Sequence, residues 1–213
     1  MASMSIPPSE TISPPIFYWG TPVVLITTEN EDGTSNIAPM SSAWWLGNRC
    51  MLGLGAISQT TINLIRTKQC VLNLASDNMA AAVNALARTT GSKEVSTATE
   101  GNGYLYFKRM NGYKYMEAEL KRVYEMMQDA EMKGFIALEV QVLRTHVHEN
   151  IRMAGHANRI DPDKWHPLIM SFQELYGLSR KKTSPSILAK INEEGYRPFS
   201  NPVDEEVTTE KDV

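Results

Sequence analysis

Four polar residues, Ser58 to Thr61, stand together where a helix is expected to begin. The stretch SQTTINLIRT (58–67) follows a short apolar run that contains two glycines. Ser58 is a suitable N-cap, and a cap there would leave the backbone N–H groups of Thr60 and Thr61 directed out of the first turn. Those donors, the helix dipole and the nearby hydroxyl groups would suit a phosphate. The alternative is a plain helix cap, because hydroxyl residues begin helices in many proteins.

Two adjacent tryptophans form the second unusual feature. Trp44 and Trp45 follow a predicted strand within APMSSAWWLG (38–47). Neighbours on an extended chain point to opposite sides, so at most one of the two needs to belong to the core. The other could form the wall of a site for a flat aromatic ligand, or it could fill a dimer interface.

The four histidines give weaker indications of chemistry. His146 and His148 would share one strand face, but no third ligand has a supporting spacing, which favours an exposed strand edge over a metal site. His156 follows a glycine in a predicted loop and could contact a substrate, although a solvent-exposed histidine is the simpler interpretation. The chain has no G-x-S-x-G elbow, no P-loop lysine motif and no G-x-G-x-x-G after a strand. No metal site and no catalytic residue is therefore predicted.

Length and composition indicate one domain. The 213 residues, 42% of them hydrophobic, are enough for one substantial core. We expect a flexible arm over the Pro- and Ser-rich residues 1–15, a domain over 16–200 and an acidic disordered tail over 201–213.

Charge and cysteine content exclude several classes of function. The net charge of −3 gives no indication of nucleic-acid binding, and the apolar runs are too short to span a membrane. No secretory signal is recognisable at the beginning of the chain. Cys50 and Cys70 each lie inside an apolar strand-like run, which predicts reduced core thiols in a cytoplasmic protein.

The elements that would position these residues are mostly strands. We predict strands over 23–28, 34–40, 49–56, 70–76 and 135–144, with a hairpin turn at Asp32-Gly33. Residues 41–48 are expected to form an interruption between the second strand and the third. The alternation in 135–144 places Ile136, Leu138, Val140 and Val142 on one face. Helices are predicted over 60–68, over 78–89 and over 184–195, the second with Asp77 as its N-cap and Gly91 as its stop. Residues 117–133 have a helical composition. Two segments are less distinct: 104–116 could form a hairpin, and 167–177 a short strand or a helix.

Several antiparallel strands with a few helices between them indicate a closed β-barrel with peripheral helices. In the third predicted strand, Gly53 and Gly55 share one face, where another group could approach the backbone closely.

The order of these segments resembles the flavin reductase-like family of FMN-binding split-barrel proteins, which includes the flavoredoxins. TPVVLITTENEDGTSNIAPMSS is followed by MLGLGAISQTTINLIRTKQCVLNLAS, so that the resemblance covers about residues 18–90. It extends more faintly over 135–178, where DPDKWHPLIMSFQELYGL is similar to the closing segment of the family. The resemblance implies a mainly β, Greek-key split barrel that forms a homodimer and binds FMN near the subunit interface.

The resemblance also implies a set of cofactor-binding residues. The phosphate would be held by Ser58, Gln59, Thr60 and Thr61 with Asn63 supporting the turn, the isoalloxazine edge would run along Ser41, Ser42, Ala43, Trp44 and Trp45, and the pyrimidine side would be closed by Asn73, Leu74, Ala75 and Ser76.

The chain departs from the family pattern in two places. Residues 117–133 are charged and methionine-rich where many relatives have a short loop, and no G-D-H-like stretch is found near the expected nicotinamide position. Flavin binding is therefore better supported than the use of NAD(P)H. The leading hypothesis is an NAD(P)H-dependent flavin reductase that transfers hydride through the flavin N5. The alternatives are an FMN-dependent oxygenase or reductase of a small organic substrate, and an electron carrier without turnover of its own.

Overall fold

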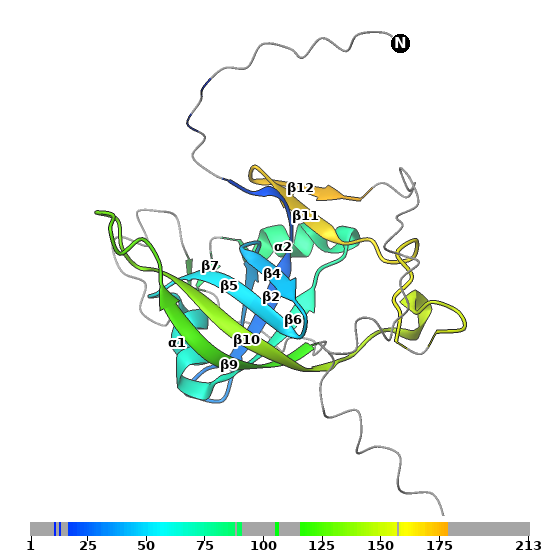
Figure 1. Cartoon of the computed structure of the whole chain (residues 1–213), viewed down its shortest axis with the longest axis horizontal. Coiled ribbons are helices and arrows are strands. Elements are labelled where there is room, and N and C mark those ends of the chain that lie inside the picture. Colours follow the sequence, from blue (N-terminus) through cyan, green and yellow to red (C-terminus); the bar gives the residue numbers. More distant parts are fainter. Residues whose placement is uncertain are drawn as a thin grey trace, which may run out of the picture.

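The central feature of the computed structural model is a curled antiparallel sheet of seven strands in the order β3-β2-β6-β9-β10-β5-β4 (Figure 1). The structure describes residues 17–87, 89–90, 105–106, 116–156 and 158–178, together with Thr11 and Ser13. The strands are β2 (Val24–Glu29), β3 (Ser35–Met40), β4 (Ala43–Leu46), β5 (Arg49–Gly55), β6 (Gln69–Leu74), β9 (Met116–Glu125) and β10 (Phe135–Thr145). The two edge strands, β3 and β4, are consecutive in the chain, so Ser41 and Ser42 join one edge of the sheet to the other.

Two smaller sheets accompany the large one in the described part of the chain. In the first, β11 (Leu168–Ser171) lies between β1 (Trp19–Pro22) and β12 (Glu174–Gly177). The backbone of Val23 donates to the carbonyl of Leu168 over 2.9 Å, so this sheet is attached at the beginning of β2. The second is a short parallel pair, β7 (Thr89–Thr90) with β8 (Leu105–Tyr106).

Two α-helices and two 3-10 helices complete the described elements. Helix α1 (Gln59–Thr67) lies between β5 and β6 in the chain and contacts β2 and β3, whereas η1 (Asp77–Met79) and α2 (Ala80–Leu86) follow β6. The second 3-10 helix, η2 (Glu149–Ile151), follows β10. No helix in the described ranges combines the length and the apolar character needed to cross a membrane.

The hydrophobic residues form two cores, one on each side of the large sheet. The barrel core contains Ile26, Leu52, Leu64, Leu72 and Leu138, all fully buried, among other residues. The second core lies between the outer face of β2 and the layer formed by α2 and β11, and its members include Leu25, Val83 and Leu168. Alternate residues of β2 therefore serve different cores, which explains why VVLITT is a continuous apolar run at its beginning.

The structure confirms the mainly antiparallel architecture with peripheral helices, including the hairpin between β2 and β3. Gly33 in that turn has φ +74°, a conformation that favours glycine. The predicted inward face of β10 is also confirmed, because Ile136, Leu138, Val140 and Val142 are all buried.

The prediction of helical structure for 117–133 is wrong. Residues 116–125 form β9, which pairs with both β6 and β10 and buries Ala118 and Leu120 in the barrel core. Glu, Lys, Arg and Met are frequent in helices, but intrinsic propensity is weaker than the pairing and burial that a sheet offers.

For 167–177, where the sequence left a strand and a helix open, the structure has the strands of the β11–β12 hairpin. Two smaller predictions need correction. Residues 41–48, expected to interrupt the strands, contain β4. The helix predicted over 78–89 is divided into η1 and α2, and Asp77 is the first residue of η1 while Ser76 occupies the N-cap. Gly91, the helix over 184–195, and the segment 104–116 other than β8 and Met116 lie outside the described residues.

Candidate functional site

Helix α1 begins as the sequence predicts, with Ser58 as its N-cap. Ser58 has extended backbone angles, φ −69° and ψ 145°, and its Oγ accepts a hydrogen bond from the N–H of Thr61 over 3.2 Å. The helix ends at Lys68, whose φ is +62° and whose N–H donates to the carbonyl of Leu64. Both ends of α1 are therefore fixed by the local sequence.

The hydroxyl groups of this cluster serve the fold. Thr61 is fully buried, and its Oγ1 donates to the carbonyl of Gly55 over 2.8 Å while it accepts from Ser58 Oγ over 2.9 Å. Thr60 is buried as well, and its Oγ1 accepts from Asn36 Nδ2 over 2.9 Å. In the described part of the chain, no group accepts from the backbone N–H of Gln59 or Thr60. An anion at this helix start would therefore bind to backbone donors and not to the threonine hydroxyls.

A buried polar network holds α1 against the sheet. Asn63, which is fully buried, donates to Asn30 Oδ1 over 2.7 Å and to Thr28 Oγ1 over 3.2 Å, and it accepts from Gln59 Nε2 over 2.9 Å. The Asn36 bond to Thr60 extends the network to β3. The family resemblance implies a supporting role for Asn63 but none for Asn36, which stands in the stretch SNIAPM (35–40).

The second predicted segment, Ser41 to Trp45, connects β3 with β4. Ser41 and Ala43 are buried, and the Oγ of Ser42 lies 2.8 Å from the hydroxyl of Tyr18. Trp44 is 58% exposed, whereas Trp45 packs against the barrel core. The two rings therefore lie on opposite sides of the strand, as predicted. The Nε1 of Trp45 is buried and has no hydrogen-bond partner in the described ranges.

The third predicted segment, Asn73 to Ser76, ends β6 and leads into η1. Asn73 is buried and donates to the carbonyl of Leu25 over 3.1 Å, and its Oδ1 has no partner among the residues that the structure describes. Leu74 packs against the barrel core, while Ala75 belongs to the second core. Ser76 donates to the Oδ1 of Asn78 and forms an isolated bridge with Pro167.

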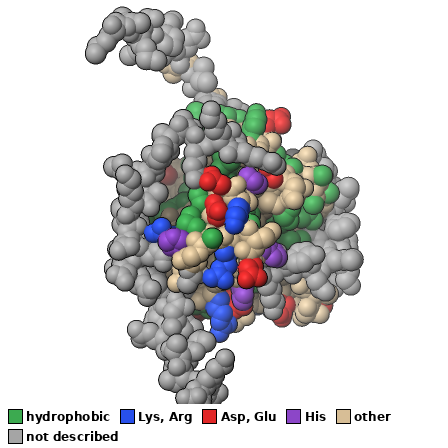
Figure 2. All heavy atoms as spheres, turned by 90° about the vertical axis from the view of Figure 1, so that its right-hand side faces the viewer, with side chains coloured by type: hydrophobic (Ala, Val, Ile, Leu, Met, Phe, Trp, Pro, Cys, Tyr) green, Lys and Arg blue, Asp and Glu red, His purple; other side chains and the backbone are tan. Residues whose placement is uncertain are grey.

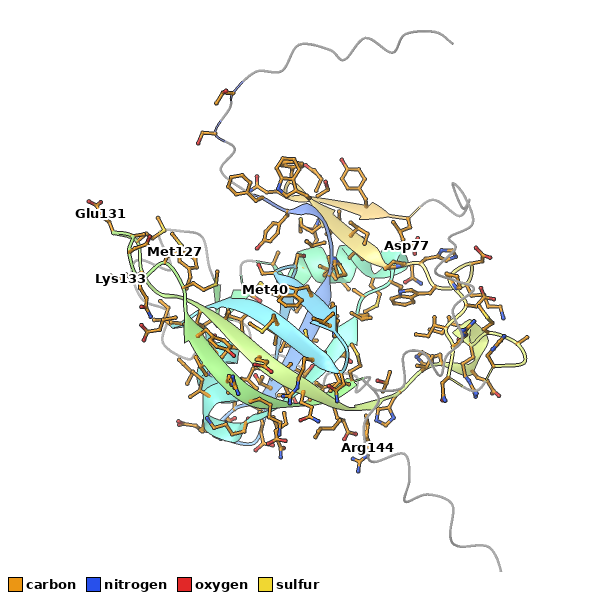
Figure 3. All side chains as sticks on the ribbon, in the orientation of Figure 1. Met40, Asp77, Met127, Glu131, Lys133 and Arg144 are labelled. Carbon is orange, nitrogen blue, oxygen red and sulfur yellow. The ribbon has the colours of Figure 1, made fainter. Side chains whose placement is uncertain are left out.

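Strand register brings the second and third segments together. Met40 and Leu74 both pair with Val24, so the ends of β3 and β6 lie on either side of the beginning of β2. Figure 3 labels Met40 and Asp77, which stand just before Ser41 and just after Ser76 in the chain, and it shows Met127, Glu131 and Lys133 of the β9–β10 hairpin on the other side of Met40 from Asp77.

Strand β5 connects the second segment with the start of α1. The N–H of Gly53 donates to the carbonyl of Ser42 over 2.7 Å, and the carbonyl of Gly55 accepts from the N–H of Ser58 over 3.1 Å. Two residues of strand span about 7 Å, so the helix start and Ser42 lie within the reach of one extended small molecule.

The glycines of β5 have different roles. A Cβ at Gly53 would lie 3.0 Å from the Cβ of Ser42, so this glycine allows the chain itself to pack closely. A Cβ at Gly55 would have no atom within 4 Å. The close approach to the backbone that the sequence predicts is made at Gly53 by Ser42 of the chain itself, whereas Gly55 leaves space beside the helix start.

Titratable groups lie beside these segments, since the hydroxyl of Tyr18 is 2.8 Å from Ser42 Oγ and Asp77 follows Ser76. Cys50 and Cys70 are free and buried, as predicted, and burial raises the pKa of each thiol to about 12. The described ranges contain no group of three or more His, Cys, Asp or Glu side chains that could hold a metal ion. The three segments supply backbone donors and small polar side chains that can bind and orient a ligand.

His146 and His148, which were expected to share one face of a strand, do not lie on a strand. Strand β10 ends at Thr145, so His146 and His148 lie beyond it. The Nε2 of His146 is 3.1 Å from Glu117 Oε1, and the hydrogen bonds from His146 and Arg144 lower the pKa of this carboxyl group. The segment before η2 is therefore attached to the beginning of β9 by a surface ion cluster.

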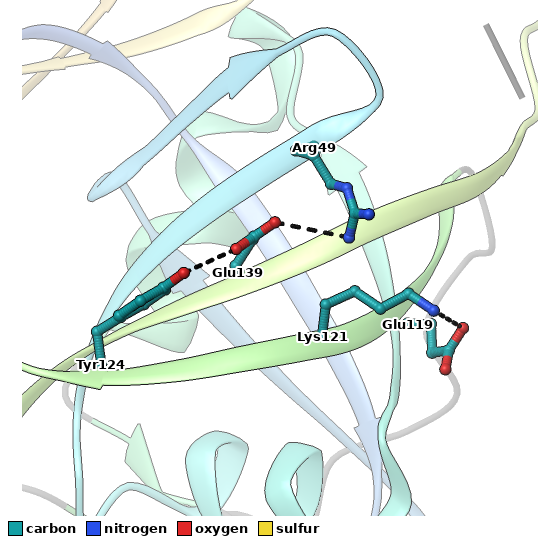
Figure 4. A network of polar contacts seen from close by, with 5 residues as sticks. All are labelled: Arg49, Glu119, Lys121, Tyr124 and Glu139. Atoms are coloured by element: carbon teal, nitrogen blue, oxygen red, sulfur yellow. Dashed lines mark hydrogen bonds and ion pairs between the residues drawn. The ribbon is translucent and has the colours of Figure 1, made fainter. Parts of the chain in front are cut away.

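A second surface network lies on the outer face of β5, β9 and β10 (Figure 4). Glu139 accepts from the hydroxyl of Tyr124 over 3.0 Å and lies 3.6 Å from Arg49 Nη1, while Lys121 donates to Glu119 over 2.6 Å. Exposed pairs of this kind contribute at most about 1 kcal/mol each to stability. We assign this network to the surface and not to the candidate site.

Comparison with known proteins gives a sequence relative and a set of related folds. No family model matches the chain. The uncharacterized protein YdfE of Bacillus subtilis (strain 168) is 36% identical over 191 residues, which is 80% of this chain and 89% of YdfE. The structure of a flavoredoxin from Methanosarcina acetivorans superimposes with a TM-score of 0.63 at 12% identity, covering 85% of this chain and 96% of the other.

A protein from Shewanella frigidimarina NCIMB 400, described as a flavin reductase with split barrel domain, gives a TM-score of 0.56 at 13% identity, over 78% of this chain and 86% of the other. The curled half-barrel with two peripheral helices is therefore the split-barrel fold, as the order of the sequence motifs predicts.

Proposed function

Because the chain belongs to the family of YdfE and has the split-barrel fold of the flavin reductase-like proteins, we propose that it is a flavin-dependent oxidoreductase that binds FMN. The observation that carries this proposal is the start of α1, where two backbone N–H groups without an acceptor in the described ranges stand beside the open position at Gly55. Such a helix start is suited to a phosphate.

The three segments fit the parts of FMN. The N–H groups of Gln59 and Thr60 would hold the phosphate, and the Ser58 cap together with Asn63 would keep these donors in place. The chain from Ser41 to Trp45 and from Asn73 to Ser76 would line the isoalloxazine edge. In those two segments Trp45 Nε1 and Asn73 Oδ1 are buried without a hydrogen-bond partner in the described ranges. The polar edge of an isoalloxazine ring could supply the missing acceptor and donor.

When bound, FMN would supply hydride chemistry at its N5 atom. The role of the protein would be to bind the phosphate, orient the ring and leave one face open to a donor or substrate. Trp44, which is largely exposed, would stand at the edge of this face. No protein acid or base is needed for this role, and the three segments contain no Asp, Glu or His.

The physiological partner reaction has three candidates. We favour hydride transfer from NAD(P)H, as in a flavin reductase; the alternatives are turnover of a small organic substrate and electron carriage without turnover. Stopped-flow bleaching of the bound flavin by NADH or NADPH tests the first. If neither nucleotide bleaches the flavin, the reductase proposal is wrong. Tight retention of FMN with slow reduction of free FMN would favour the carrier.

The phosphate role can be tested at the helix cap. Asp and Asn replace Ser as N-caps at little cost, so Ser58→Asp and Ser58→Asn should both fold with nearly unchanged stability. The added carboxylate of Ser58→Asp would repel a phosphate at the helix start. We expect Ser58→Asp to weaken FMN binding at least tenfold and riboflavin binding little, and Ser58→Asn to behave like the natural chain.

Flavin fluorescence titrations with FMN and riboflavin measure both affinities. Equal loss for the two flavins would show that the helix start does not hold the phosphate. A protein whose melting temperature does not rise with FMN would contradict flavin binding altogether.

We also propose a cytoplasmic location, because both buried cysteines are free thiols.

A further inference from the structure

We propose that Tyr18 is a positioning residue of the flavin site, which makes the hydroxyl of Ser42 a hydrogen-bond donor to the isoalloxazine ring. This inference rests on the proposed function, because Ser42 belongs to the segment that we expect to line the ring edge. The hydroxyl of Tyr18 lies 2.8 Å from Ser42 Oγ, and both residues are half-buried. Tyr18 comes directly before β1 and lies outside the three segments assigned to FMN.

The β11–β12 hairpin fixes the backbone of Tyr18. The N–H of Phe172 donates to the carbonyl of Tyr18 over 2.8 Å. Phe172 and Gln173, which form the two-residue turn of this hairpin, have φ +46° and +76°. Residues other than glycine rarely adopt such angles, and they keep them only where the surrounding contacts hold the chain. The turn that bonds to Tyr18 is therefore a defined and partly strained structure.

A β-bulge beside Tyr18 bends the beginning of β1. The register of β1 against β11 shifts between Trp19 and Thr21, and Gly20 between them has φ +91°. Bulges bend a strand and change the direction of its side chains. Trp19 is 66% exposed, whereas the side chain of Tyr18 reaches Ser42. The local backbone thus places the phenol at the junction between the two edges of the large sheet.

The chain that follows Tyr18 also reaches the third segment. The carbonyl of Val23 accepts from the N–H of Ala75 over 3.1 Å. Two residues before Val23, the Oγ1 of Thr21 is buried and has no hydrogen-bond partner in the described ranges. Residues 18–23 therefore connect the second segment with the third, and they contribute a buried polar atom of their own.

The direction of the hydrogen bond follows from the two hydroxyl groups. Each hydroxyl has one proton, so only one member of the pair donates in the bond that they share. A phenolic O–H is a stronger donor than an aliphatic O–H, so Tyr18 donates and the proton of Ser42 Oγ stays available. The ligand atom that faces Ser42 then has to be an acceptor, such as a ring nitrogen or a carbonyl oxygen of the isoalloxazine.

The hydrogen bond also limits the motion of the serine hydroxyl. The backbone of Ser42 is fixed already, because its carbonyl accepts from the N–H of Gly53 over 2.7 Å. The rotation of the side chain is the remaining freedom, and the bond to Tyr18 restricts it. A donor that is oriented before the ligand arrives loses less entropy on binding. Tyr18 therefore acts on the ring through Ser42 and not by direct contact.

The surroundings of this hydrogen bond are mainly apolar. Trp19 and Phe172 pack edge to face on the same small sheet. Figure 2 shows hydrophobic side chains at the top of the molecule, where Figure 1 places this sheet, while the Lys, Arg and His side chains gather lower down. A hydrogen bond is electrostatically stronger in apolar surroundings than in water. This setting favours one stable arrangement of the two hydroxyl groups.

Tyr18→Phe removes the hydroxyl and keeps the ring. We expect it to weaken FMN and riboflavin binding equally, by about fivefold, because Tyr18 acts on the isoalloxazine and not on the phosphate. Ser42→Ala should weaken both flavins at least as much. The double variant should bind no more weakly than Ser42→Ala alone, since the two residues act as one unit. Fluorescence titrations with both flavins measure these affinities.

The visible absorption spectrum of bound FMN provides a readout that a merely structural role would not change. We expect Tyr18→Phe and Ser42→Ala to shift the flavin bands in the same direction. Tyr124→Phe is the matched control, because it removes a phenolic hydroxyl that donates to Glu139 over 3.0 Å on the outer face of β9. Its affinities and its spectrum should equal those of the natural chain.

The outcomes separate this inference from the proposed function. If the natural chain binds FMN and Tyr18→Phe equals it in affinity and spectrum, the positioning role is wrong and the proposed function stands. Losses that add in the double variant would also contradict the role. If the natural chain binds neither flavin, the proposed function fails and this inference fails with it. Circular dichroism without flavin establishes that each variant is folded.

Discussion

At the scale of single residues, the candidate site offers backbone N–H donors and mostly small side chains. The two cysteine thiols lie elsewhere, in the barrel core. The hydroxyls of Thr60 and Thr61 are used inside the fold, so the groups left for a ligand are backbone N–H groups. The two thiols, which would be the strongest nucleophiles, are buried in the barrel core. This division suits a protein whose bound cofactor carries the chemistry.

The buried thiols of Cys50 and Cys70 should be inert in the folded protein. With pKa values of about 12, only about one thiol in ten thousand is ionised at pH 8. We expect both to react with a thiol reagent such as Ellman's reagent only after denaturation. Rapid stoichiometric modification of the folded chain at pH 8 would contradict the burial.

The same raised pKa predicts how stability depends on alkaline pH. The folded state keeps the thiols neutral, so their contribution to stability is fully present below the ordinary value of 9.0 and decreases as pH rises from there towards about 12. The double variant Cys50→Ala with Cys70→Ala should show a smaller decrease in urea midpoint over this range.

At the scale of elements, α1 is held by polar contacts as much as by apolar ones. Its inward face contains Leu64 in the barrel core, but Asn63 beside it bonds to Thr28 and Asn30. A helix of nine residues is marginal by itself, so its position depends on these tertiary contacts. The network therefore fixes the donors that we assign to the FMN phosphate.

Removing the centre of this network should destabilise the protein. Asn63→Ala removes three hydrogen bonds in or near the interior, those with Gln59, Thr28 and Asn30, and we expect a loss of about 3 kcal/mol in the free energy of unfolding. Urea denaturation measures it. Asn84→Ala, at an exposed position on α2, is the control and should change the free energy of unfolding by less than about 0.5 kcal/mol. Similar midpoints for the two variants would contradict the structural role of Asn63.

At the scale of the whole molecule, the described surface retains large apolar side chains on its edges. Trp44 and Leu46 are 58% and 72% exposed on β4, which is an edge strand of the large sheet. Trp19 and Phe172 pack edge to face with ring centroids 4.6 Å apart at the surface of the β1–β11–β12 sheet. Exposed apolar groups that cluster in this way are typical of interfaces.

We expect the chain to be a homodimer, as the resemblance to the split-barrel family implies, and light scattering should give twice the 23.8 kDa of one chain. Leu46→Lys places a charge on the edge strand and should shift the equilibrium towards monomer. Ile160→Lys, in the loop between η2 and β11 and 42% exposed, is the control and should remain dimeric. A natural chain that elutes as a monomer at micromolar concentration would contradict the dimer.

The sequence by itself determined those features whose signal is local. The alternation in 135–144 encodes the buried face of β10, Asp32-Gly33 encodes the hairpin, and Ser58 encodes the start of α1, because each depends only on neighbouring residues and on backbone geometry. The order of these features also indicated the split barrel.

Only the tertiary structure decided the features that depend on partners distant in the chain. Residues 116–125 have the composition of a helix but form β9, because β6 and β10 offer hydrogen bonds and a buried face on either side. Asn36 donates to Thr60 across 24 positions of the chain, and a Cβ at Gly53 would lie 3.0 Å from the Cβ of Ser42. Long-range pairing sets these contacts, and local propensity is too weak a preference to predict them.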